Sequence, residues 1–346
     1  MWTLRRWLEF WLSTQENRLR PSTMVGYRSV VYDHLIPTLG HHTMRKLRAK
    51  DAQRAMDRIS RGHVRGGRLI SPSSLNGIRA VLRTALSEAR RQGVIDLNPA
   101  RGLKLPSGAK PRAVVWDDSY VKAWQNTGVR PRVAVWDLHH VGQFLSSVQN
   151  DRFFSLWWLV ALRGLRRGEI AGLRWEDIDL AGGELTVREQ IVVVRGADWV
   201  GPPKSAAGVR TMSLDRFSVE LLSALWRDQR RRLGWVDPNE RVFVHADGKP
   251  VRPDWLTRRF RKLADSEGLP PVRLHDLRHG AAGVEAAAGM DLKQIQEDMG
   301  HSTAWTTIDT YSCIFKSMAA VAVQKSADLL MSHVKLRWAL SGAYQA

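Results

Sequence analysis

Residues 274–280 read LHDLRHG, and this short stretch places two imidazoles and a guanidinium on one helix-prone segment. Three other stretches concentrate reactive side chains in a similar way: GLRRGE at 164–169, GPPKSAAG at 201–208 and GHSTAWTTIDTYS at 300–312. If the four stretches meet in the fold, one site holds two guanidiniums, an ammonium, two imidazoles and a phenol. The side chains that would form this site are Arg166, Lys204, His275, Arg278, His301 and Tyr311.

This set of side chains suits attack on a phosphodiester without a metal ion. Two arginines can neutralise the non-bridging oxygens of a pentacovalent phosphorane. A tyrosine hydroxyl can be a covalent nucleophile, although forming its phenolate at pH 7 costs roughly 4 kcal/mol that nearby cations or a base must supply. A histidine can move the proton, and a lysine can protonate the departing oxygen. The stretches do not gather the carboxylates of a two-metal nuclease, so we expect neither a metal nor a cofactor.

Each of these residues also has an ordinary structural interpretation. His275 and His279 lie four residues apart on an expected helix, a spacing that can ligate zinc, but Asp276 stands where a zincin has glutamate. Cys313 is the only cysteine, which excludes a disulfide framework and a cysteine-based zinc site. Taken singly, the arginines and the lysine also suit the surface, and Tyr311 also suits an amphipathic core.

The charge of the chain is unevenly distributed. Lysine and arginine total 53 against 34 aspartate and glutamate, which gives a formal net charge of +19. Residues 1–112 carry 22 basic and 7 acidic residues, whereas residues 113–346 carry 31 and 27. A strongly basic first part is typical of a module that binds a polyanion, and nucleic acid is the leading candidate. An arginine-rich genome composition is the alternative, but it predicts a uniform excess along the chain.

Length and composition exclude several other classes of protein. With 346 residues, 44% of them hydrophobic and 25% charged, the chain is expected to form about two globular domains and to be neither disordered nor collagen-like. No apolar run approaches the ~20 residues that a membrane span needs. The first residues also lack the apolar centre of a signal peptide. We therefore expect a cytoplasmic protein with no membrane contact.

Helical periodicity dominates the first hundred residues. Apolar residues recur at helical spacing over 4–12, 21–37, 51–59 and 72–93. The second of these segments is expected to stop at Pro37 and Gly40, and the last has Ser71 as N-cap and Pro72 in its first turn. Opposite the apolar stripe of the last segment lie four arginines whose side chains can contact phosphates: Arg79, Arg83, Arg90 and Arg91.

Beyond residue 100 the pattern changes twice. Residues 101–135 are rich in Gly, Pro, Lys and Arg and are expected to form a linker in which part of the chain packs. Helical patterns resume over 137–162. Strands are expected over 184–195 and 209–214, with Lys204 on the turn-rich tip between them. The rest of the chain is helical again, so the fold is expected to be mainly α with a small antiparallel β-sheet.

The four stretches, in this order, resemble the signature of tyrosine recombinases, the phage integrase family. GLRRGE is similar to the family's first arginine box, PKSAAGVRTMSL to its lysine segment and LHDLRHG to its His-x-x-Arg box. In GHSTAWTTIDTYS a histidine precedes a tyrosine by ten residues, as in the family's last box. The resemblance extends over about 4–330. It implies a helical, SAM-like core-DNA-binding domain at 1–100, a linker at 101–135, a catalytic domain at 136–330 and a C-terminal tail at 331–346.

The resemblance also implies a role for each residue of the site. Arg166 and Arg278 would clamp the scissile phosphate, and Glu169 would support Arg166 from behind. Lys204 would be the general acid that protonates the departing oxygen. The two remaining roles fall to the histidines and the tyrosine.

His275 and His301 would assist phosphate binding and proton movement. Tyr311 would attack the phosphorus, form a 3′-phosphotyrosyl link and release a 5′-hydroxyl. A 5′-hydroxyl from the partner duplex would then attack in turn, so the bond energy stays in the covalent link and no ATP is needed.

The chain departs from the family pattern at two positions beside the boxes. The first box commonly begins with threonine, whereas Arg163 stands there in this chain. The tyrosine is often followed by Ser-His, whereas here it is followed by Ser312 and Cys313. Neither departure touches a residue of the expected catalytic set, although the first one is expected to alter the packing behind Arg166.

The resemblance implies a site-specific DNA recombinase that integrates or excises a phage or mobile element. Its partners would be double-stranded DNA, three further copies of the chain in a tetramer on paired DNA sites, and DNA-bending or directionality factors, at the nucleoid of the host cell. Three alternatives stay open on the sequence. They are a Xer-like chromosome or plasmid resolvase, a type IB topoisomerase, and a non-catalytic DNA-binding protein on the same scaffold.

Overall fold

The computed structural model describes residues 1–62, 69–108 and 113–300. Contacts divide them into two compact units, of which the first holds the N-terminal helices together with residues 193–199 and the second holds the other described residues. Each unit has its own hydrophobic core. The described helices include none that is long and apolar enough to span a bilayer. The mainly helical fold with small antiparallel sheets confirms the expected fold class.

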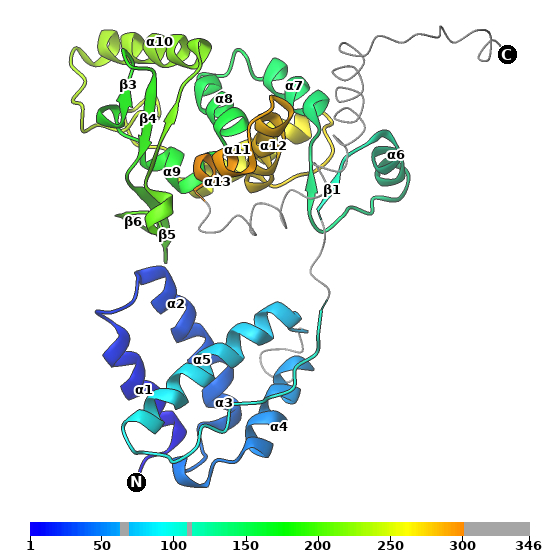
Figure 1. Ribbon diagram of the computed structural model, residues 1–346, viewed down its shortest axis with the longest axis vertical. Helices are drawn as coiled ribbons and strands as arrows, with labels where there is room; N and C mark the ends of the chain where they lie inside the picture. The colour runs from blue at the N-terminus through cyan, green and yellow to red at the C-terminus, as the bar shows by residue number, and fades with distance from the viewer. Residues whose placement is uncertain (63–68, 109–112, 301–346) are drawn as a thin grey trace, which may run out of the picture. The chain divides into compact units, whose positions relative to one another are not determined.

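The first unit is helical (Figure 1). Its elements are α1 (Leu4–Gln15), α2 (Pro21–Val30), the π-helical turn η1 (Val31–Leu35), α3 (Ile36–Leu39), η2 (Met44–Lys46), α4 (Ala49–Ser60) and α5 (Pro72–Arg91). The predicted start of α5 is confirmed, because the Ser71 hydroxyl accepts a hydrogen bond from the Ser74 N–H at 3.1 Å and Pro72 occupies the first turn. The arginines of α5 are thereby fixed on one rigid helix.

The second predicted helix ends at only one of its two expected stops. It passes Pro37 without a break and ends at Gly40, which caps α3. The π-helical turn η1 lies directly before the proline, where Ile36 donates its N–H to the Val31 carbonyl. Pro37 has no N–H to place in the helical ladder, and a wider turn is one way for a helix to continue past such a residue.

The helices of the first unit pack against each other through their apolar faces. The buried positions of α1 (Leu4, Trp7, Leu8, Trp11 and Leu12) are those expected from their spacing. The Trp7 indole N–H donates to the Ala85 carbonyl of α5 at 2.9 Å, so the polar group of this large core side chain is satisfied. The apolar stripe of α5 is buried in the same core, which leaves the polar face of this helix toward solvent.

The helices of the second unit surround one large core. They are α6 (Asp118–Thr127), α7 (Leu138–Ser147), α8 (Phe154–Arg163), α9 (Arg167–Gly172), η3 (Trp175–Asp177), η4 (Ala206–Gly208), α10 (Arg216–Leu233), α11 (Pro253–Ser266), α12 (Leu274–Ala287) and α13 (Leu292–Asp298). Helices α8 and α12 pack side by side, and α13 packs on α12 (Figure 1). Phe144, Trp157 and Phe260 fill the centre as tilted or edge-to-face rings.

The strands form three small sheets. The strands are β1 (Val114–Val115), β2 (Ala134–Val135), β3 (Ile178–Asp179), β4 (Glu184–Val187), β5 (Gln190–Val194), β6 (Ala197–Gly201) and β7 (Arg210–Ser213). One antiparallel sheet has the order β3-β4-β7, with Val187 opposite Arg210. Strands β5 and β6 form a hairpin that turns at Arg195 and Gly196, both at positive φ. The predicted strand over 184–195 is therefore two strands with a bend between them.

Much of the expected linker is built into the second unit. Strands β1 and β2 pair in parallel, and α6 connects them. Trp116, between β1 and α6, is fully buried and contacts the Trp124 ring edge-on at a centroid distance of 5.8 Å. The tryptophans that interrupt this Gly/Pro-rich stretch are the residues that anchor it.

Candidate active site

Arg278 is deeply buried, more so than Arg166, Lys204 or His275 among the described residues of the predicted site. It lies in the first half of α12 with 2% of its surface exposed. Its Nη1 donates to the Gly164 carbonyl at 2.5 Å, directly before the first arginine box. Gly164 ends α8 at φ +60°, and a Cβ there would lie 2.8 Å from Cε of Met299. The positive φ would strain any other side chain, so glycine is favoured at this position, which joins α8, α12 and the end of α13.

Arg166 lies two residues further on, at the N-cap of α9. Its Nη1 donates to Oε1 of Glu169 at 2.6 Å, and its Nη2 donates to the Gly300 carbonyl at 3.2 Å. The side chain keeps 32% of its surface exposed, so it has access to a ligand. Arg278 is thus bound to Gly164, and Arg166 lies in the short loop that begins at Gly164.

Glu169 is a buried anion between several cations. Burial alone would raise its pKa, but the charge and hydrogen bond of Arg210 and the charges of Arg166 and Arg278 lower the pKa to about 2. The carboxylate is only 1% exposed, and because these cations lower its pKa it is ionised at neutral pH. Its Oε1 accepts the hydrogen bond from the Arg166 guanidinium, and its Oε2 accepts the Arg166 backbone N–H at 2.9 Å.

Arg210 is a member of this cluster that sequence reasoning missed. Its Nη2 donates to Oε2 of Glu169 at 3.0 Å and its Nε donates to the Asp298 carbonyl at 2.6 Å. Arg210 and Met212 alternate with exposed residues along β7, so both face the core. A cation on the apolar face of a strand was the available signal, because such a residue requires a buried anionic partner.

The two histidines of LHDLRHG occupy different environments. His275 is exposed at the start of α12, and its pKa is lowered by partial burial and by the charges of Arg278, Arg166 and Arg273, against an opposing effect of Asp276. His279 lies one turn on, and burial together with His275 and the arginines lowers its pKa to about 4. His275 therefore presents a neutral imidazole at pH 7 beside the arginine pair.

Lys204 does not lie on the tip of the β-hairpin. The hairpin turn is at residues 195–196, and Lys204 follows β6 in the segment that leads to η4. Its side chain is exposed, and no hydrogen bond or ion pair to another described residue fixes it. The structure does not bring Lys204 into contact with Arg166 or Arg278, so its role as an acid rests on the sequence.

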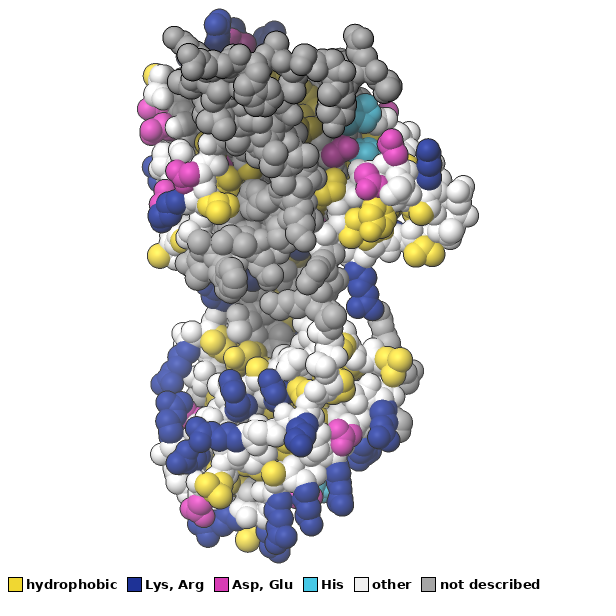
Figure 2. Space-filling view, turned by 45° about the vertical axis from the view of Figure 1, so that its right-hand side comes forward, with side chains coloured by type: hydrophobic (Ala, Val, Ile, Leu, Met, Phe, Trp, Pro, Cys, Tyr) yellow, Lys and Arg dark blue, Asp and Glu magenta, His cyan; other side chains and the backbone are white. Residues whose placement is uncertain are grey.

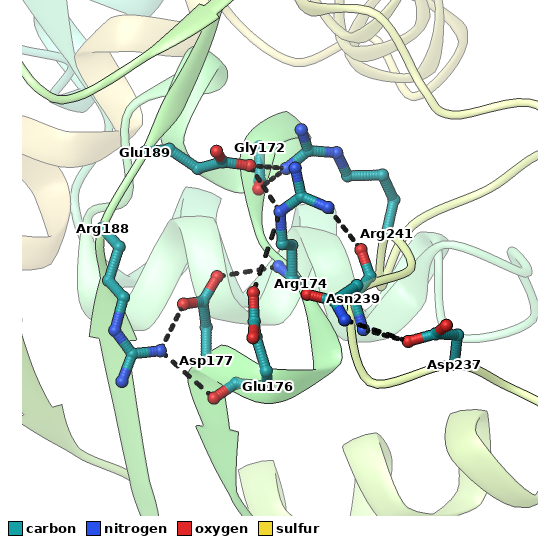
Figure 3. A network of polar contacts seen from close by, with 9 residues as sticks. All are labelled: Gly172, Arg174, Glu176, Asp177, Arg188, Glu189, Asp237, Asn239 and Arg241. Carbon is teal, nitrogen blue, oxygen red and sulfur yellow. Dashed lines mark hydrogen bonds and ion pairs between the residues drawn. The ribbon is translucent and has the colours of Figure 1, made fainter.

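An ion-pair network supports the strands that lead to Lys204 (Figure 3). Arg174 donates to Glu189 at 2.8 Å, and Arg241 binds the same carboxylate and the Gly172 carbonyl. Arg188 donates to Asp177 at 2.7 Å. The bend between β4 and β5 is therefore fixed to α9 and η3.

His301 and Tyr311 lie outside the described residues. The last described residue is Gly300, whose carbonyl accepts the hydrogen bond from Arg166. Gly300 has φ +57°, and a Cβ there would lie 2.8 Å from the Ala207 carbonyl oxygen. The chain therefore enters the last box of the signature in direct contact with the first arginine box.

A buried carboxylate next to this cluster predicts a pH-dependent stability. Glu285 is 3% exposed; burial raises its pKa to about 7, against the charge of Arg163 and together with that of Asp298. The folded chain then holds a proton that the unfolded chain releases near its ordinary pKa of about 4.3, so this group lowers the free energy of unfolding as pH rises from about 4.5 to 7.

The Glu285→Gln variant removes this titration. We expect its free energy of unfolding, relative to the wild type, to rise by about 3 kcal/mol between pH 4.5 and pH 8. Urea unfolding of both proteins at several pH values measures the difference, in which the titration of other groups cancels. Parallel pH profiles for the two proteins would contradict the assignment.

Family models match part of each of the two units just described. The model of the phage integrase family matches residues 146–317, and that of the phage integrase N-terminal SAM-like domain matches residues 3–60. Both arginine boxes and the last box fall inside the first match. The chain belongs to the phage integrase family of tyrosine recombinases. This confirms the family that the four sequence stretches indicate, and it makes the chain a site-specific recombinase.

Individual relatives of this recombinase are distant in sequence. It is 26% identical to the ICEBs1 integrase of Bacillus subtilis, over 75% of this chain and 67% of that protein. It is also 26% identical to tyrosine recombinase XerC of Pseudomonas putida, over 92% and 95%. The structure of the Tn1549 transposon integrase in complex with transposon right-end DNA is similar in fold, with a TM-score of 0.69 at 20% identity, covering 93% of the recombinase and 100% of that chain.

The basic residues of the recombinase are prominent on the first unit. Figure 2 shows lysine and arginine side chains spread over the visible face of its N-terminal helices, with few acidic ones among them. Arg83 and Arg90 of α5 are exposed, whereas Arg79 is half-buried and donates to the Leu103 carbonyl at 3.4 Å. Arg91 is exposed and pairs with Glu88 of the same helix. Of the four predicted arginines, Arg83 and Arg90 are therefore the most available to a ligand.

Proposed function

We propose that this recombinase cleaves and rejoins double-stranded DNA through a 3′-phosphotyrosyl link at Tyr311, and that it integrates or excises a phage or mobile element. The observation that carries the proposal is the hydrogen bond from Arg166 to the Gly300 carbonyl. Because of this hydrogen bond, the segment that holds Tyr311 begins at the cluster of side chains that would bind the phosphate. Arg278 belongs to this cluster through Gly164.

The described residues supply most of the chemistry that such a reaction needs. Arg166 and Arg278 neutralise the non-bridging oxygens as the phosphorus becomes five-coordinate. Their positive field also favours the Tyr311 phenolate. His275, neutral at pH 7, can accept or relay the proton, with His301 in the same role. Lys204 donates a proton to the departing 5′-oxygen, which completes the proton balance of the step.

The geometry also supports reversal of the cleavage. The phosphotyrosyl ester replaces one phosphodiester by another, so its bond energy is kept for the return attack by a 5′-hydroxyl. Attack by the hydroxyl of another duplex gives recombination. Because two duplexes exchange four strand ends and each chain supplies one nucleophile, we propose a homotetramer on paired DNA sites, with DNA-bending or directionality factors as accessory partners, at the nucleoid of the host cell.

The N-terminal arginines make a separate prediction about DNA affinity. Arg83→Ala and Arg90→Ala are each expected to weaken binding and to reduce the slope of log affinity against log salt concentration by about 1, because each removes one phosphate contact. Fluorescence anisotropy with labelled duplex at several salt concentrations measures both quantities. The matched control is Arg216→Ala, an arginine of α10 that is 94% exposed and pairs with Glu220. An unchanged slope for Arg83→Ala would refute its assignment as a phosphate contact.

A nicked half-site tests the catalytic proposal. Duplexes selected from a random pool by binding to the full chain provide the DNA, and a nick close to the cleavage point lets the 5′-hydroxyl fragment diffuse away. The wild-type chain is expected to accumulate an adduct that survives denaturation and carries the label placed on the 3′-phosphate side. Tight binding without any adduct would instead support the non-catalytic alternative. Recombination between two sites on one plasmid distinguishes a recombinase from a relaxing topoisomerase.

The XerC-like alternative concerns the biological role and not the chemistry. A resolvase acts between sites of one replicon, whereas an integrase joins an element to a chromosome. Supplying the selected site on two separate plasmids, or twice on one plasmid, measures this preference. Efficient reaction only on the plasmid that carries the site twice would favour the resolvase alternative.

A further inference from the structure

Arg163 stands where the family commonly has threonine, and its surroundings are unusual. It is the last residue of α8, and its side chain is 10% exposed. Carboxylates from two other helices share its guanidinium. Asp298 of α13 lies 2.9 Å from Nη2, and Glu285 of α12 lies 3.5 Å from Nη1. The arginine therefore joins α8, α12 and α13 directly behind the first arginine box.

Asp298 occupies the point at which α13 ends and the last box begins. Its backbone carbonyl accepts the hydrogen bond from Arg210 at 2.6 Å. The next residue, Met299, is fully buried against Gly164. The residue after that is Gly300, whose carbonyl accepts the hydrogen bond from Arg166. Three consecutive residues are thus each held by a residue of the α8–α9 region or of β7.

We propose that Arg163 is a positioning residue for strand cleavage. Its ion pair with Asp298 fixes the last turn of α13, so that the Gly300 carbonyl holds the Arg166 guanidinium in the orientation that meets the phosphate. Arg163 touches neither the phosphate nor the nucleophile in this role. The inference rests on the proposed function, because it concerns the step in which Arg166 neutralises the phosphate.

Because Glu285 is a second partner of Arg163, the role of the ion pair between Arg163 and Asp298 can be tested without loss of the fold. Removal of the Asp298 carboxylate leaves the guanidinium of Arg163 with a second carboxylate within reach, so the buried cation keeps a partner. Removal of Arg163 itself would instead leave two buried carboxylates facing each other. Substitution of Asp298 is therefore the informative change. Glu285→Gln is the matched control, since it neutralises the other carboxylate on the same guanidinium without touching α13.

The experiment compares single-turnover cleavage of the nicked half-site. We expect Asp298→Ala to lower the cleavage rate at saturating protein by about tenfold or more, because small displacements of a catalytic group are costly. The protein concentration for half-saturation should stay within about twofold of the wild type, because phosphate contacts elsewhere set binding. Glu285→Gln should cleave within about twofold of the wild type at pH 7. Asp298→Asn, whose amide oxygen still accepts from Arg163, should restore most of the rate.

A methylphosphonate at the scissile position separates positioning from a general structural defect. This linkage lacks the negative charge that Arg166 neutralises, so the rates of Asp298→Ala and the wild type should converge on it. An equal deficit on both substrates would overturn the proposal, as would wild-type cleavage by Asp298→Ala or an equal loss in Glu285→Gln. If Asp298→Ala does not fold, Asp298→Ser takes its place, because its short side chain does not replace the contact with Arg163; a wild-type cleavage rate for Asp298→Ser with a wild-type unfolding midpoint overturns the proposal as well. A wild-type chain that forms no adduct refutes the proposed function itself, which is a distinguishable result.

Discussion

The Tyr311→Phe variant is expected to bind the half-site as the wild type does and to form no covalent adduct. The substitution removes one oxygen atom and keeps the ring, so only the nucleophile is lost. Without it the rate of adduct formation should fall below detection, by at least about 10⁴-fold, because loss of a nucleophile removes the covalent route altogether. Denaturing electrophoresis of the labelled half-site gives the measurement.

Tyr120 supplies the control for this variant. It lies on α6 and is 44% exposed, away from the described part of the arginine cluster. Tyr120→Phe should form the adduct at the wild-type rate. If the adduct persists in Tyr311→Phe, another residue is the nucleophile and the assignment of the last box is wrong.

The second large effect is expected from Arg278→Lys. The variant keeps a positive charge, but an ammonium cannot hold the Gly164 carbonyl and present further donors to a phosphate in a fixed plane. The cleavage rate should fall about 10²- to 10³-fold, as for loss of one preorganised donor to a developing charge. Single-turnover cleavage of the nicked half-site measures it.

Arg273→Lys is a matched control on the same helix. Arg273 precedes α12, is 59% exposed at its side chain, and pairs with Asp276 at 2.7 Å. Its conversion to lysine keeps the charge near His275 and should change the cleavage rate by less than about threefold. Equal losses in Arg273→Lys and Arg278→Lys would show that the effect comes from α12 as a whole and not from the buried guanidinium.

The sequence predicted the local parts of this fold better than their assembly. Ser71 and Pro72 mark the start of α5 because capping depends on neighbouring residues only. The mixed architecture followed from changes in periodicity along the chain. The expected stop at Pro37 and the expected position of Lys204 on a hairpin tip were wrong, whereas the stop at Gly40 is confirmed. The first depends on a π-helical turn and the second on how β4 bends into β5.

The candidate site was predictable only where one stretch of sequence carries the chemistry. Arg166 and Arg278 belong to short, recognisable boxes, and the structure places both beside Gly164. Arg210 carried only the signal of a cation on the apolar face of β7, and Asp298 carried none. Their importance comes from contacts with residues far away in the chain, and periodicity or spacing within one segment does not reveal such contacts. The same holds for Arg163, whose departure from the family pattern was visible while its partners were not.

The guanidinium shared by two carboxylates also affects how this enzyme can be altered. In a chimera that takes α13 from a relative without an acidic residue at position 298, Arg163 would depend on Glu285 alone for its charge balance. The opposite exchange would bring a buried carboxylate, that of Asp298, into a relative that has threonine in place of Arg163. An exchange of these segments therefore has to transfer the residues at positions 163, 285 and 298 together.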